Sequence, residues 1–197
     1  PPDLLPRPRA PEKGREQVAR AFCGRENGME QIVIRRAEEG DVPAIARIIN
    51  EAWRTAYAGI VPQDYLDALR EEDKARRLRE GLARVPEMRY YVLLASGEPV
   101  GAASLHRTRS ADLPDAAEFS FFYLLPAVWR RGYGSRLLAH LKREAAALGY
   151  RRLCCWVLEE NGRAVSFYES QGMPRDGARQ TETVGIPLEA VRCVTAL

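Results

Sequence analysis

An abrupt change of residue pattern at Gly134 constrains the fold more than any other feature of this 197-residue sequence. Before it, FSFFYLL (residues 119–125) is an apolar run closed by Pro126, which predicts a buried strand over residues 118–125. After it, apolar residues recur at helical spacing to residue 148, and Gly149 predicts the stop. A strand, a glycine-rich turn (WRRGYG, residues 129–134) and a helix therefore follow one another directly.

The turn has the composition of an anion site. The first N–H groups of a helix lack intrahelical partners and lie at the positive end of the helix dipole. Gly132 and Gly134 allow a ligand to approach the backbone closely, and Arg130 and Arg131 add positive charge. One interpretation is a cradle for a phosphorylated ligand such as a diphosphate. The other is a tight strand-to-helix turn with solvated arginines. The Gly-Lys-Ser/Thr of triphosphate loops and the third glycine of the dinucleotide fingerprint are both missing from this stretch.

The other segments alternate between patterns typical of strands and of helices. We expect strands at residues 32–36, 89–95, 99–107, 151–158, 178–184 and 191–196. We expect helices at residues 41–57, 62–85 with a break near Arg70, and 161–171, with Asp41 as the N-cap of the first. This order predicts an α+β fold. Its mixed, mostly antiparallel twisted sheet of about seven strands would contain a central β-α-β unit over residues 118–158, with flanking helices.

The distribution of charge argues against two classes of partner. The formal net charge is +3, and residues 1–28 hold six basic and four acidic residues, so the rest of the chain carries only +1. A nucleic-acid-binding surface needs a strongly basic face, and no apolar run approaches the roughly 20 residues of a membrane span. We therefore expect no nucleic-acid partner and no membrane span.

The proline-rich opening, PPDLLPRPRAPEKGRE, predicts a disordered extension, a tag or an upstream mis-start over residues 1–28. The domain is then expected over residues 29–197. Cys154 and Cys155 are adjacent on a predicted strand and so point to opposite faces, and no cysteine and histidine spacing is typical of zinc. We therefore expect reduced thiols, no metal and a cytoplasmic location.

A second stretch narrows the interpretation of the turn. CCWVLEENGRAVSFYESQGM (residues 154–173) combines a strand, Asn161, a helix with Tyr168 and a stop at Gly172. Together with LLPAVWRRGYGSRLL (residues 124–138), it resembles the GNAT superfamily of N-acetyltransferases. There V-x-P precedes Q/R-x-x-G-x-G/A, and E-N-x-x-A-x-x-F-Y-E-x-x-G-F follows the next strand. Met173 replaces the usual Phe, and Trp129 replaces the Gln or Arg that usually begins the glycine motif. The resemblance covers residues 31–197 and implies the GNAT fold.

The resemblance also implies acetyl-CoA as the co-substrate. In this family the pyrophosphate binds at the glycine turn, and the pantetheine arm enters where two strands splay apart and pairs with one of them. A backbone N–H of that strand would polarise the thioester carbonyl, and an asparagine would hydrogen-bond the pantetheine region. The alternatives are plain sheet core for the strand residues and a simple N-cap for the asparagine. The implied cofactor-binding residues are Phe122, Tyr123, Leu124, Arg130, Arg131, Gly132, Tyr133, Gly134, Ser135 and Asn161.

Two residues are implied as catalytic. Acetylation of an amine needs a base for the amine and an acid for the departing thiolate. Tyr168 occupies the family's position for the acid, and its alternative role is that of a core aromatic. Glu118 begins the strand where family members often carry a glutamate base, acting directly or through water; its alternative is an exposed strand-end carboxylate. Weaker candidates for a functional role are Glu159, Glu160 and His106, whereas His140 is expected to face outward.

The acceptor and the assembly are less constrained. Trp53, Tyr57 and Tyr65 lie in the helical region that walls the acceptor pocket in this family, although Trp53 also completes the apolar stripe of the first helix. The amine stays open among amino acid, polyamine, antibiotic and protein N-terminus. The edges of the C-terminal strands allow a homodimer. An N-acetyltransferase acting by direct attack is the leading hypothesis. A catalytically silent acyl-CoA-binding sensor or interaction module and a nucleotide-phosphate enzyme are the alternatives.

Overall fold

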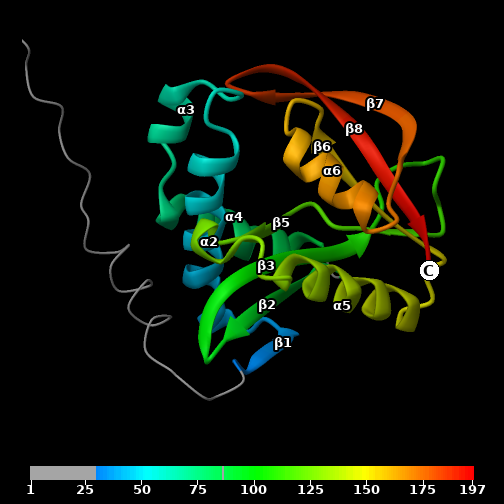
Figure 1. The fold of residues 1–197 in the computed structure, drawn as a ribbon, viewed down its shortest axis with the longest axis horizontal. Helices are drawn as coiled ribbons and strands as arrows, with labels where there is room; N and C mark the ends of the chain where they lie inside the picture. The colour runs from blue at the N-terminus through cyan, green and yellow to red at the C-terminus, as the bar shows by residue number, and fades with distance from the viewer. Residues whose placement is uncertain (1–29, 86) are drawn as a thin grey trace, which may run out of the picture. The chain divides into compact units, whose positions relative to one another are not determined.

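The structure, a computed structural model, describes residues 30–85 and 87–197, so the extension predicted at residues 1–28 lies outside the described residues. The described strands form one eight-stranded sheet in the order β1-β2-β3-β4-β6-β8-β7, with β5 pairing with β3 (Figure 1). The strands are β1 (Ile32–Arg36), β2 (Arg89–Ala95), β3 (Glu98–Arg107), β4 (Ala116–Glu118), β5 (Phe122–Leu124), β6 (Arg152–Leu158), β7 (Arg175–Val184) and β8 (Ile186–Ala196). The predicted α+β class is confirmed, with eight strands in place of about seven.

The helices follow the predicted order. They are α2 (Val42–Ala56), α3 (Gln63–Asp67), α4 (Glu71–Arg84), α5 (Tyr133–Ala147) and α6 (Gly162–Ser170), with short 3-10 turns η1 (Glu39–Asp41) and η2 (Pro126–Val128). Among the pairs formed by these strands, β4 and β6 run parallel and the others run antiparallel. Helix α5 connects the two sides of the parallel pair, which confirms the central β-α-β unit.

The sheet separates two layers of helices. Tyr90 and Tyr91 are neighbours on β2, so their side chains point to opposite faces. The Tyr90 hydroxyl donates to the Leu78 carbonyl oxygen of α4 at 3.1 Å, and the Tyr91 hydroxyl donates to Glu144 Oε2 of α5 at 2.9 Å. Helices α4 and α5 therefore cover opposite faces, and Figure 1 shows α5 lying across β2 and β3.

The single strand predicted over residues 118–125 is in fact two strands. β4 pairs with β3 up to His106 opposite Glu118, and pairing resumes in β5 with Ala103 opposite Phe122. Two residues of β3 thus face three residues, 119–121, which is the mismatch that defines a β-bulge. Because β4 alone pairs with β6, β5 leaves the edge of β6 open.

A side chain satisfies the backbone at this bulge. The Ser104 hydroxyl oxygen accepts the N–H of Ser120 at 2.8 Å and the N–H of Phe121 at 3.1 Å. These two amides would otherwise lack a ladder partner, and an unpaired buried amide costs about 1–3 kcal/mol. Ser104 therefore stabilises the interruption between β4 and β5.

Asp41 stands at the N-cap position of α2 as expected, but its side chain does not cap the helix. Its carboxylate instead accepts two bonds from the Arg35 guanidinium, at 2.6 and 2.9 Å, and one from the Glu38 N–H. An ion pair to β1 offers the carboxylate a stronger partner than the helix amides, and it fixes the entry into α2.

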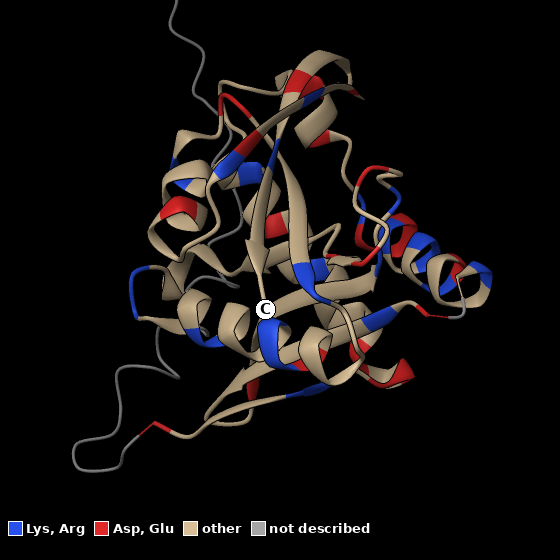
Figure 2. Ribbon diagram, turned by 90° about the vertical axis from the view of Figure 1, so that its right-hand side faces the viewer, with Lys and Arg blue, Asp and Glu red and all other residues tan. Residues whose placement is uncertain are grey.

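Acidic and basic residues alternate along much of the ribbon in the view of Figure 2. None of the helices within the described residues is both long and apolar enough to cross a membrane. Strand β5, the end of β6, the start of α5 and helix α6 position the site described next.

Candidate active site

A cavity of about 480 Å³ lies between β5, the end of β6, the first turn of α5 and helix α6. Most of the predicted cofactor residues line it: Phe122, Tyr123, Leu124, Arg130, Gly132, Gly134, Ser135 and Asn161. Tyr168 lines it as well, whereas Glu118, Arg131 and Tyr133 do not. The Tyr133 side chain is buried in the core, and Arg131 is exposed. The structure thus brings together most of the predicted residues and separates three of them.

The glycine turn is built by two left-handed residues. Gly132 has φ +78° and Arg130 has φ +63°, a region that costs a non-glycine residue conformational energy. Gly132 occupies the N-cap position of α5 and so offers no side chain to its first amides. At Gly134 the constraint is space, because an added Cβ would lie 3.2 Å from the Phe167 ring of α6. The two glycines therefore have different roles.

The free edge of β5 faces the cavity. Leu125 N–H donates to the Val100 carbonyl oxygen, and Ser104 N–H donates to the Phe121 carbonyl oxygen. Backbone groups alternate in direction along an antiparallel strand. The backbone groups of Phe122 and Leu124 therefore point away from β3, toward the opening beside β6.

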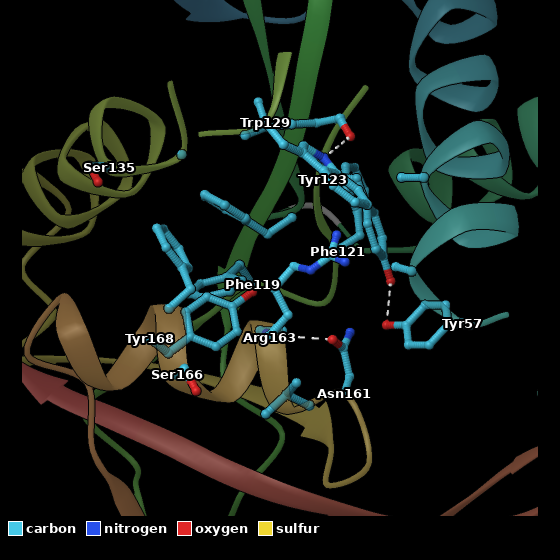
Figure 3. A pocket seen from close by; sticks show the side chains of 18 of the residues that line it. Tyr57, Phe119, Phe121, Tyr123, Trp129, Ser135, Asn161, Arg163, Ser166 and Tyr168 are labelled. Carbon is cyan, nitrogen blue, oxygen red and sulfur yellow. Dashed lines mark hydrogen bonds between the residues drawn. The ribbon is translucent and has the colours of Figure 1, made fainter. Parts of the chain in front are cut away.

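Trp129 and Arg163 join the turn to α6 across the mouth of the cavity. The Trp129 indole N–H donates to the Leu124 carbonyl oxygen at 2.9 Å, which fixes the ring against the end of β5. The Arg163 guanidinium carbon lies 4.3 Å from the indole centroid, a distance typical of a cation–π contact (Figure 3). Trp129 was noted as a departure from the family pattern, and Arg163 was missed because its contact joins residues 34 positions apart.

Tyr168 places a phenol in an apolar part of the cavity. Its side chain is buried, and its ring lies 5.6 Å from the ring of Phe119 and 5.4 Å from that of Phe167 (Figure 3). Among the residues that the structure describes, the Tyr168 hydroxyl has no hydrogen-bond partner. Burial raises the pKa of Tyr168 well above its usual value of 10, so the hydroxyl stays protonated at neutral pH.

Asn161 combines the two roles considered for it. Its side-chain oxygen accepts the Ala164 N–H at 3.2 Å, which makes it the N-cap of α6. The same side chain is buried and lines the cavity (Figure 3). The cap occupies the oxygen. Burial raises the pKa of Tyr57, and a hydrogen bond from the same Asn161 side chain opposes this rise with a smaller effect.

Glu118 is held outside the cavity. It is 1% exposed, not the exposed carboxylate considered above. Its oxygens accept from the Thr108 hydroxyl at 3.0 Å, the Arg109 N–H at 3.2 Å and the Arg109 guanidinium at 2.9 Å. Burial raises the pKa of Glu118, but the bonds from Arg109 outweigh it and the net pKa is lowered. This geometry favours an ionised structural carboxylate over a base that contacts substrate.

We predict that Glu118→Gln lowers the free energy of unfolding by about 1–3 kcal/mol at pH 7, because the change removes a buried charged acceptor from the Thr108 hydroxyl and from Arg109. Because folding lowers the pKa of Glu118, the ionised carboxylate stabilises the folded protein above the unfolded pKa of about 4.3. This stabilisation is lost as the pH falls through the pKa of the folded protein. Urea unfolding should show a smaller difference between this variant and the wild type at pH 3 than at pH 7. The exposed Glu98→Gln is the control, and equal stability of Glu118→Gln and wild type at pH 7 would contradict the assignment.

Of the two histidines, only His140 differs from expectation. His106 is buried in β3 and bonds Ser120, which lines the cavity, although His106 itself does not. His140 does not face outward: it is half-buried, with its ring 5.2 Å from that of Tyr91, and burial lowers its pKa. Glu159, a weaker candidate, pairs with Arg179 on β7.

Only part of the predicted acceptor wall reaches the cavity. Tyr57 lines it, and its hydroxyl lies 3.2 Å from that of Tyr123 (Figure 3). Trp53 packs edge-on against Tyr57 with ring centroids 4.7 Å apart, and Tyr65 lies against Trp53 at 6.2 Å. Neither Trp53 nor Tyr65 is a lining residue, so both support the wall from behind.

Comparison with known protein families identifies this chain as an acetyltransferase. The family model described as "Acetyltransferase (GNAT) family" matches residues 43–173. The chain therefore belongs to the GNAT family of acetyltransferases. Within the described residues, no group of three or more His, Cys, Asp or Glu could hold a metal ion.

One curated relative and two solved structures are similar to this chain. The uncharacterized N-acetyltransferase YuaI of Bacillus subtilis (strain 168) is 28% identical over 165 residues, covering 81% of this chain and 90% of the relative. The PaiA N-acetyltransferase of Thermoplasma acidophilum, solved in complex with coenzyme A, has a TM-score of 0.65 at 20% identity and covers 85% of this chain and 99% of that one. YncA of Salmonella typhimurium, solved with its cofactor acetyl-CoA, has a TM-score of 0.62 at 21% identity, covering 85% and 94%. The two solved structures share the fold.

Proposed function

We propose that this acetyltransferase transfers the acetyl group of acetyl-CoA to a primary amine of a small molecule or peptide by direct attack of the amine. The observation that carries the proposal is the hydroxyl of Tyr168. It is buried, protonated and unpartnered among the described residues, in the same cavity that the glycine turn and the edge of β5 border. Two solved relatives of the same fold hold coenzyme A or acetyl-CoA.

The residues present fit a coenzyme A diphosphate at the turn. The N-cap of α5 is a glycine, so no side chain competes for the first helix amides, and the first turn carries no acidic residue. Arg130 lines the same end of the cavity and supplies positive charge. Amides at a helix N-terminus with a nearby guanidinium form a site for an anion. Ser135 and Arg131 remain predicted partners of the diphosphate, and Tyr133 contributes through its backbone.

The edge of β5 fits an extended amide-bearing arm. Phe122 and Leu124 direct their backbone groups toward the opening, so they can pair with such an arm as a strand would. Coenzyme A supplies the activated thioester, and a backbone N–H of β5 would donate to the thioester carbonyl oxygen. The Asn161 amide nitrogen would donate to the same arm. The side chain of Tyr123 keeps its place in the aromatic wall.

Tyr168 is the proposed acid. A sulfur that leaves as thiolate needs a proton, and a protonated phenol in an apolar site can donate one at neutral pH. The raised pKa of Tyr168 keeps this hydroxyl protonated across the physiological pH range. Glu118 is proposed only as a structural carboxylate, since its oxygens are occupied by Thr108 and Arg109.

The charge of the cavity indicates the kind of amine. Among its described lining residues none is aspartate or glutamate, whereas Arg130 and Arg163 are both present. A polyamine needs carboxylates to offset its charges, so the lining favours an acceptor with one amine and an apolar or aromatic body. The rings of Tyr57 and Trp129 would contact such a body.

An amine panel with free-thiol detection tests the function. We expect phenethylamine to release thiol from acetyl-CoA at least about tenfold faster, in kcat/KM, than spermidine, a difference of about 1.4 kcal/mol. A dipeptide amide and glycine complete the panel. Tight acetyl-CoA binding without thiol release from any amine would contradict the enzyme and favour the silent acyl-CoA-binding module. Faster acetylation of spermidine would contradict the acceptor class alone.

A further inference from the structure

The β-bulge brings three polar side chains together beside the cavity. Ser104 lies opposite Tyr90 in the register, and the Tyr90 hydroxyl reaches α4, so Ser104 and His106, two residues further along β3, point to the α4 face. Ser120, in the bulge, lies between them. Its hydroxyl oxygen is 3.1 Å from that of Ser104 and 3.0 Å from His106 Nε2.

The hydrogen bonds fix where the protons lie. His106 Nδ1 is 2.7 Å from the Arg107 carbonyl oxygen, which can only accept, so Nδ1 carries the proton and Nε2 of the neutral ring is bare. The Ser120 hydroxyl therefore donates to Nε2. The Ser104 oxygen already accepts two backbone N–H groups, so its own hydroxyl proton goes to Ser120. Ser120 thus gives its proton to a histidine while keeping an oxygen lone pair.

That lone pair is available to a ligand. Ser120 lines the cavity, whereas His106 is only 5% exposed and does not. Glu118 lies opposite His106 in the register, so its ionised carboxylate is on the same face of the sheet. Arg109 forms an ion pair with this carboxylate. A proton arriving on the imidazole would therefore face a negative charge. Among the described lining residues no aspartate, glutamate or histidine offers another route.

We propose that Ser120 and His106 form a relay that takes the proton of the acceptor amine, an inference that rests on the proposed function. As the amine nitrogen bonds to the thioester carbon, its N–H proton passes to Ser120 Oγ while the Ser120 hydroxyl proton passes to His106 Nε2. The carbon–sulfur bond breaks with its electron pair on sulfur, which takes the proton of Tyr168. The imidazolium then returns its proton through Ser120 to the Tyr168 phenolate by way of solvent. Ser120 is the catalytic residue, and His106 positions its hydroxyl and accepts its proton.

The test uses the full chain with acetyl-CoA and phenethylamine, or the fastest amine of the panel. We expect Ser120→Ala and His106→Gln each to lower kcat about 100-fold, within the range typical of general-base catalysis. The Kd for acetyl-CoA should stay within threefold of wild type. Ser120→Thr, which keeps a hydroxyl, should restore most of the activity. The matched controls are Ser170→Ala and His140→Gln, which change a serine and the second histidine outside the cavity.

Rescue by Ser120→Thr separates a relay from a structural role, because only the relay depends on the hydroxyl. A loss of kcat in His106→Gln that is absent in His140→Gln assigns the effect to the histidine that bonds Ser120. If the wild type acetylates an amine and Ser120→Ala retains kcat within threefold, the relay is overturned while the proposed function stands. If no amine is acetylated although acetyl-CoA binds, both are overturned.

Discussion

Gly134→Asp is expected to abolish the binding of acetyl-CoA. The added Cβ would lie 3.2 Å from Phe167 Cζ, and Gly134 lines the cavity at the first turn of α5, so the variant places a carboxylate at the proposed anion site. A negative charge against a diphosphate in a partly dry cavity reverses the attraction that the α5 amides and Arg130 provide. We expect Kd to rise at least about 100-fold, or about 2.7 kcal/mol. Ligand-dependent thermal stabilisation measures the loss directly.

Two variants separate the causes of that loss. Gly134→Ala adds the Cβ without the charge, so its affinity should fall by much less than that of the aspartate variant. Gly40→Asp adds the same carboxylate at a position with nothing within 4 Å of an added Cβ, and it should bind as the wild type does. A folded Gly134→Asp protein that acetyl-CoA still stabilises as it does the wild type would place the diphosphate elsewhere.

Tyr168→Phe is expected to lower kcat by about 10²–10⁴-fold while leaving the affinity for acetyl-CoA nearly unchanged. The ring packing against Phe119 and Phe167 survives the change, and only the proton donor is lost. Since the pKa of Tyr168 is raised, the wild-type enzyme should keep its acid protonated beyond pH 10. Steady-state kinetics with calorimetric Kd values distinguish turnover from binding.

The control for this variant is Tyr150→Phe, which removes a hydroxyl outside the cavity lining. Equal losses of kcat and affinity in Tyr168→Phe would assign the hydroxyl to binding. A turnover unchanged from wild type would remove Tyr168 from the chemistry altogether.

Local signals explain what the sequence predicted well. β1 and β2 have the bounds that their apolar patterns predicted, because alternation and the turn at Ser96 and Gly97 are read within a few residues. The helices after the turn and after Asn161 begin within one residue of expectation, since a glycine follows the end of each and Asn161 caps the second. Most of the implied cofactor-binding residues lie at the starts of these two helices.

Non-local contacts explain what it missed. The split between β4 and β5 depends on a hydroxyl of Ser104, sixteen residues before Ser120 in the chain. An extra residue in a strand shifts the faces to which the following side chains point. Glu118 was expected to begin a strand, but it ends β4, and its carboxylate is bound by Thr108 and Arg109 outside the cavity. The same bulge brings Ser120 to the cavity.

The most direct test of the central claim is isothermal titration of the wild-type protein with acetyl-CoA and with coenzyme A. If the α5 turn and the edge of β5 form one coenzyme site, both compounds bind the wild type with one site per chain. The Gly134→Asp variant then gives no binding heat with either compound. A well-folded wild-type protein that gives no binding heat with either compound, at several temperatures, would contradict the account.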